Sequence, residues 1–66
     1  MASHDWKELE WVTTRLDELR NRLDAAEDAN QIAAIYALEE EITGLEAKRK
    51  QLLHGLIERV VDEAAA

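Results

Sequence analysis

The residues Glu27-Asp28-Ala29-Asn30-Gln31 separate two apolar patterns that do not share a helical phase. Before this stretch, apolar side chains recur at spacings of three and four, the stripe of a helix packed along one seam: Leu9, Val12, Leu16, Leu19, Leu23 and Ala26. After it, a second stripe follows the same spacing through Ile35, Leu38, Ile42, Leu45, Arg49, Leu52 and Leu56. The first stripe would continue to positions 30, 33 and 37, so the two patterns predict two helices.

The side chains of this stretch suit a connection between helices. Asp28 is predicted to cap the second helix, with Gln31 three residues on, and Asn30 tolerates a left-handed backbone. At the other end, Ser3 or Asp5 can cap the first helix, and Asp5 with Glu8 has the spacing of a capping box. The prediction is one all-α domain over residues 1–66, with helices at about 4–27 and 31–63 and a turn at 28–30.

Two alternatives remain open at this stage because the stretch contains neither proline nor glycine. The chain could form one uninterrupted helix in a parallel coiled coil, or it could break at Thr43-Gly44 into three shorter helices. The antiparallel hairpin is favoured because of the phase change. In a hairpin with a short turn, the numbers of facing residues should add up to about 58.

A single seam leaves several large apolar side chains unused. A chain of 66 residues without cysteine has few ways to stabilise a small core, and oligomerisation is a common one. We therefore expect a homodimer in which two hairpins form a four-helix bundle. The predicted interface residues are Trp6, Trp11, Leu53, Ile57, Val60 and Val61. This plan resembles Rop-like hairpin dimers in architecture alone, and the resemblance implies no activity.

The charge balance predicts which partners the chain avoids. Fifteen acidic and eight basic residues give a net charge of -7, which repels nucleic acid and anionic membranes. No apolar run approaches the roughly 18 residues of a membrane span, so no membrane partner and a cytoplasmic location are expected. The acidic residues, including Glu39 to Glu41, favour a basic protein as a partner besides the chain itself, and the tryptophan-bearing face is a second candidate surface.

Arg49 interrupts the second apolar stripe with a charge. A buried guanidinium needs an acidic partner, and the expected register places Arg49 opposite Leu9, within reach of Asp5 or Glu8. The prediction is a structural ion pair that fixes the register. The alternatives are a stem lying along the seam with its charge in water, or a cation that binds a ligand.

The sequence contains few residues that could carry out catalysis or bind a metal. His4 and His54 are predicted to lie at the same level of the hairpin with Glu58 nearby, which makes these three residues weak candidates for a metal site. Neither histidine follows a glutamate at the spacing of a di-iron bundle, and no cofactor is predicted. No histidine is placed to activate Ser3, Thr13 or Thr14.

These observations favour a non-enzymatic role. The expected function is that of a small acidic homo-oligomer acting through protein-protein interaction, as a regulator, inhibitor, assembly factor or accessory factor. A metal-binding or small-ligand-binding four-helix bundle is the alternative.

Overall fold

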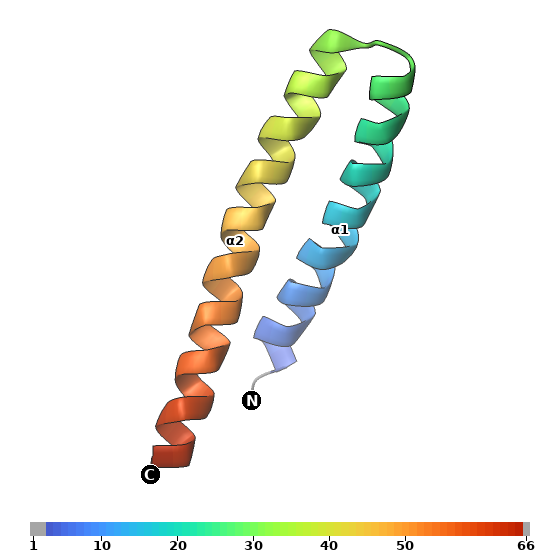
Figure 1. The fold of residues 1–66 in the computed structure, drawn as a ribbon. Coiled ribbons are helices and arrows are strands. Elements are labelled where there is room, and N and C mark those ends of the chain that lie inside the picture. The colour runs from blue at the N-terminus through green and yellow to red at the C-terminus, as the bar shows by residue number, and fades with distance from the viewer. Residues whose placement is uncertain (1–2, 66) are drawn as a thin grey trace.

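The protein is a hairpin of two antiparallel helices in a computed structural model that describes residues 3–65. Helix α1 spans Ser3–Asp28 and α2 spans Ile32–Ala65, and Figure 1 shows them side by side with α2 extending beyond the start of α1. The hairpin measures 54 × 16 × 13 Å. The predicted all-α hairpin is confirmed. Both alternatives are wrong, because the chain reverses at 29–31 and α2 continues through Thr43 and Gly44.

The turn is a Schellman-type ending of α1. Asn30 adopts a positive φ of 59°, as predicted, and this left-handed residue turns the chain away from the helix axis. The Gln31 N–H donates to the Ala26 carbonyl at 2.9 Å, and the Asn30 N–H donates to the Glu27 carbonyl at 3.1 Å. These bonds satisfy two carbonyls that the end of α1 would otherwise leave without partners.

Asp28 does not cap α2 and Asp5 does not cap α1, whereas the alternative cap Ser3 has its side chain outside the described part of the chain. Asp28 is the last residue of α1, and α2 begins after Gln31, whose carbonyl accepts the Ile35 N–H at 3.0 Å. The Schellman bonds explain the shift, since they hold Asp28 in helical geometry. Helix α1 begins at Ser3, so Asp5 lies inside its first turn, and its carboxylate contacts Arg59.

The core lies along the single seam between the helices. Val12, Leu16 and Leu19 of α1 are fully buried and cluster with Ile42 of α2. Side chains of the same two stripes pack around this cluster, namely Leu23, Leu38, Leu45 and Leu52. Both apolar patterns of the sequence therefore meet at one interface, which leaves the remaining faces of each helix available for other contacts.

Candidate protein interface

Several large apolar side chains lie outside the seam and remain exposed. Within the described residues, these are Trp6, Trp11, Ile32, Tyr36, Ile57, Val60 and Val61. Each keeps more than half of its surface in water, and Tyr36 reaches 70%. Apolar side chains that gather on a surface, rather than being scattered singly, usually mark an interface, so their arrangement matters more than their number.

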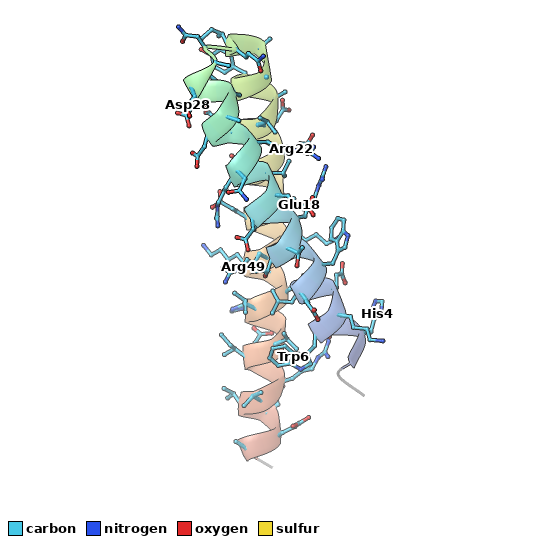
Figure 2. The ribbon with its side chains drawn as sticks, turned by 90° about the vertical axis from the view of Figure 1, so that its right-hand side faces the viewer. His4, Trp6, Glu18, Arg22, Asp28 and Arg49 are labelled. Carbon is cyan, nitrogen blue, oxygen red and sulfur yellow. The ribbon has the colours of Figure 1, made fainter. Side chains whose placement is uncertain are left out.

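One group lines an apolar groove at the open end of the hairpin. The groove has a volume of about 210 Å³ and is lined by Trp6, Leu53, Leu56, Ile57, Val60 and Val61. Helix α2 contributes all of these except Trp6, because it continues beyond the first turns of α1. Figure 2 shows Trp6 lying against the C-terminal part of α2. We call this surface the open-end groove.

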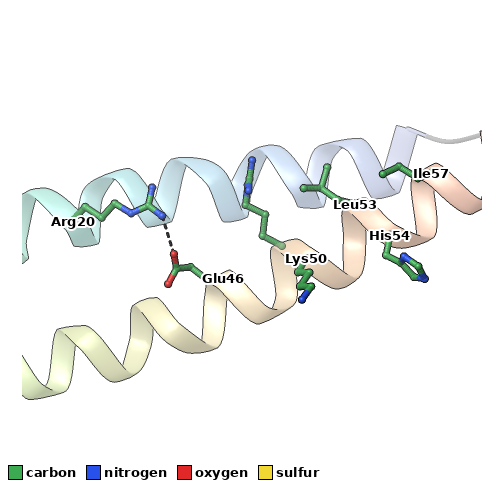
Figure 3. Close-up of a pocket in the computed structure, with 7 residues that line it drawn as sticks. Arg20, Glu46, Lys50, Leu53, His54 and Ile57 are labelled. Atoms are coloured by element: carbon green, nitrogen blue, oxygen red, sulfur yellow. Dashed lines mark hydrogen bonds and ion pairs between the residues drawn. The ribbon is translucent and has the colours of Figure 1, made fainter.

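A second, charged groove adjoins the first. It has a volume of about 440 Å³ and is lined by Arg20, Glu46, Arg49, Lys50, Leu53, His54 and Ile57. Arg20 Nη2 donates to Glu46 Oε2 at 3.1 Å across the two helices, as drawn in Figure 3. Leu53 and Ile57 belong to both grooves, so apolar and charged surfaces form one continuous side of the hairpin.

Ile32 and Tyr36 form a separate apolar patch near the turn. Ile32 is the first residue of α2, and the two side chains are 57% and 70% exposed. The two positions are four residues apart in sequence, so the side chains project from the same face of the helix. We call this pair the turn-end patch.

Trp11 lies apart from the other predicted interface residues. Five positions along a helix correspond to a rotation of roughly 140°, so Trp11 and Trp6 point in different directions. The Lys48 ammonium lies 5.9 Å from the centroid of the Trp11 ring and also contacts Glu8 Oε1 at 2.9 Å. Polar neighbours surround the ring, since Thr14, Arg15 and Glu18 line the same hollow.

The ion pair predicted for Arg49 is not found among residues 3–65. Glu8 is paired with Lys48, and Asp5 with Arg59. Arg49 is exposed and lines the charged groove instead, on the opposite side of the hairpin from His4 in Figure 2. Its long stem allows it to occupy a seam position while the guanidinium stays in water.

Within the described residues, four ion pairs that the sequence did not predict join the helices. Lys48 contacts Glu8 at 2.9 Å, Arg20 contacts Glu46 at 3.1 Å, Arg15 contacts Glu41 at 3.9 Å, and Arg59 contacts Asp5. Most of these residues flank the apolar stripes, where antiparallel helices place opposite charges. A search of the flanking positions for complementary charges would have found them.

The histidines do not join into a metal centre. His54 Nε2 lies 2.9 Å from Glu58 Oε1, whereas His4 Nε2 lies 4.0 Å from Glu8 Oε2. Each pair belongs to one helix, and its side chains are exposed except for Glu8, which is half-buried. No group of three potential metal ligands is present in the part of the chain that the structure describes, so the three predicted candidates are divided between two separate pairs.

Comparisons with protein-family profiles, with curated proteins and with solved structures find no match to this chain. Neither described helix is long and apolar enough to cross a membrane. The two grooves, the turn-end patch and the distribution of charge are the features of the molecule that bear on its function.

Proposed function

We propose that this chain acts through protein-protein contact, as a non-enzymatic helical hairpin that pairs with a second copy of itself into a four-helix bundle. In this role it serves as a small regulator, inhibitor, assembly factor or accessory factor. The observation that carries the proposal is the open-end groove, where Trp6, Ile57, Val60 and Val61 remain largely exposed in the single hairpin.

Burial of the open-end groove by a partner would be energetically favourable. Burying one large apolar side chain contributes about 1.5–3 kcal/mol, and a chain this short gains little from its own interior because a small domain buries only about 60% of its surface. The core of the single hairpin is one seam with few fully buried side chains. A second hairpin on the open-end groove would add a second apolar seam without lengthening the chain.

The charge left outside such a contact suits a basic protein. Glu10, Asp17 and Asp24 recur every seven residues on α1, and all three are exposed. Spacings of seven place them on one face of the helix. This acidic face is the surface on which we place a further, basic protein partner.

Solution mass and helicity test the proposal. Sedimentation equilibrium over a concentration series, with circular dichroism, should show a helical dimer that persists at low micromolar concentration. Ile57→Glu places a charge in the open-end groove and should shift the chain to a monomer. Ala47→Glu adds the same charge at an exposed position outside both grooves and should leave the dimer intact. A wild-type chain that is monomeric at every concentration would overturn self-association.

A further inference from the structure

Helix α2 carries a second stripe that the intrachain seam does not use. Eight positions follow one another at alternating spacings of four and three: Ile32, Tyr36, Glu39, Thr43, Glu46, Lys50, Leu53 and Ile57. All of them are exposed except Leu53, which is half-buried. This alternation is the seven-residue repeat of a coiled-coil seam, and it is offset around the helix from the stripe that packs on α1. We call it the outer stripe.

The outer stripe is apolar at both ends and charged in the middle. Ile32 and Tyr36 form the turn-end patch, Leu53 and Ile57 line the open-end groove, and the charges lie between them. In one hairpin the two apolar ends are separated by most of the length of α2 (Figure 1). A partner that covers both must therefore present two apolar patches at the same separation, with complementary charges between them.

The chain itself meets this requirement when it is reversed. A two-fold axis crossing α2 between positions 44 and 45 places Ile32 opposite Ile57 and Tyr36 opposite Leu53. The same axis places Glu39 opposite Lys50 and Thr43 opposite Glu46. Apolar residues then meet apolar residues at both ends, and the symmetry produces two Glu39–Lys50 pairs. Isologous contacts of this kind are the commonest form of homodimer.

Other registers fit worse. Parallel pairing places each residue opposite its own copy, so Glu39, Glu46 and Lys50 would each face a like charge. Sliding the antiparallel pair by one repeat places Ile32 opposite Lys50 in one direction and Glu39 opposite Ile57 in the other. Within residues 3–65, the side chains of Glu39 and Lys50 form no ion pair of their own, whereas Glu46 is neutralised by Arg20.

We propose that a second copy of this chain docks antiparallel on the outer stripe of α2, with Ile32 and Tyr36 of each copy filling the open-end groove of the other. The proposal rests on the proposed self-association and specifies its surface and register. The acidic positions of α1 described above exclude that helix from the centre of the contact, so the two α2 helices form the centre and the two α1 helices flank them.

Charge reversal tests the register. Glu39→Lys alone and Lys50→Glu alone each convert two attractive pairs into two repulsive ones, which should weaken homodimerisation by about tenfold or more. The double variant Glu39→Lys/Lys50→Glu should restore the wild-type dissociation constant. A mixture of the two single variants should form heterodimers in preference to either homodimer, because both cross pairs are then attractive. Glu40→Lys carries the same charge change one residue outside the stripe and should dimerise like the wild type at 0.15 M sodium chloride, where repulsion between the net charges is screened.

A second measurement reports the direction of the helices. The chain contains no cysteine, so introduced thiols have no competitors. Under oxidation, a mixture of Ile32→Cys and Ile57→Cys chains should form mixed disulfides, because these positions face each other across the two-fold axis. Disulfides between two Ile32→Cys chains would indicate parallel pairing and overturn the register.

The possible failures are distinguishable. A wild-type monomer at all concentrations overturns the proposed function and the register together. A wild-type dimer in which Glu39→Lys and Glu40→Lys have equal effects, and in which the mixture shows no heterodimer preference, overturns the register alone. Circular dichroism of each variant separates loss of pairing from loss of helix.

Discussion

Arg49 forms no ion pair among residues 3–65. It occupies a position in the second apolar stripe, yet it is exposed and lines the charged groove. The carboxylates predicted to hold it are engaged by Lys48 and Arg59. The second apolar stripe therefore carries an exposed, charged side chain at this level in place of an apolar one.

Replacing Arg49 with leucine should stabilise the protein. The substitution removes no ion pair that the structure shows and adds apolar surface to the seam, so the free energy of unfolding should rise by about 1 kcal/mol. Urea denaturation at fixed protein concentration measures the change. In a Glu8→Gln background the gain should be the same, since residues that do not interact give additive effects. A loss of stability that disappears in that background would show that Arg49 and Glu8 pair in solution.

In the turn, the side-chain types predict the left-handed residue, whereas backbone hydrogen bonds determine where α1 ends. Asn30 could be identified from sequence because asparagine is among the few non-glycine residues that tolerate left-handed geometry. Asp28 was assigned wrongly as a cap because side-chain type alone does not say which residue the helix retains. The hydrogen bonds from the Gln31 and Asn30 N–H groups extend α1 through Asp28. These bonds come from the backbone, which is the same in nearly all residues, so the side-chain types do not reveal them.

At the scale of the elements, the stripes of both helices predicted their mutual packing. Leu16, Leu19 and Val12 are almost fully buried, and Leu38, Leu45 and Leu52 pack against their cluster. The spacing alone was sufficient to predict these buried positions, because residues three and four apart lie on the same face of a helix. The interhelical ion pairs depend on which flanking positions face each other, which requires the register that the structure supplies.

A substitution at Gly44 tests whether another chain packs against this face of α2. It lies in the middle of the helix with a negative φ, and a Cβ placed on it meets no atom within 4 Å. Gly44→Ala should therefore raise the free energy of unfolding by about 0.5–1 kcal/mol, because alanine loses less backbone entropy than glycine in a helix. Thermal and urea unfolding followed by circular dichroism measure the gain. Position 44 lies outside the outer stripe, so destabilisation would mean that another chain approaches this face closely.

At the scale of the whole molecule, the hairpin is a rod of 54 × 16 × 13 Å with apolar surface near both ends of one side. The sequence identified most of these residues, including Trp6, Leu53 and Ile57, as unused by the seam. It also grouped Trp11 with them, whereas the structure places Trp11 beside Lys48 on a different side. Whether two side chains share a surface depends on where each lies around its own helix and on how the two helices are packed. The sequence pattern gives only the first of these.

Association of two such rods brings together two copies with a net charge of -7 each. At a mean separation of roughly 30 Å in water, the screened repulsion is on the order of 2–3 kcal/mol at 0.01 M salt and well below 1 kcal/mol at 0.15 M. The two Glu39–Lys50 pairs oppose this repulsion, but exposed pairs contribute only about 0.2–1 kcal/mol each and also weaken with salt. The repulsion is the larger of the two effects at low salt.

The dimer should therefore tighten as salt increases. We expect the dissociation constant to fall by about tenfold between 0.01 M and 0.15 M sodium chloride, as screening removes the repulsion between the copies. Sedimentation equilibrium at several salt concentrations measures this change, and the Glu40→Lys variant, which carries less negative charge, should show a smaller salt effect. A dimer that weakens steadily with salt would instead require a contact dominated by attraction between opposite charges, with more pairs than the outer stripe provides.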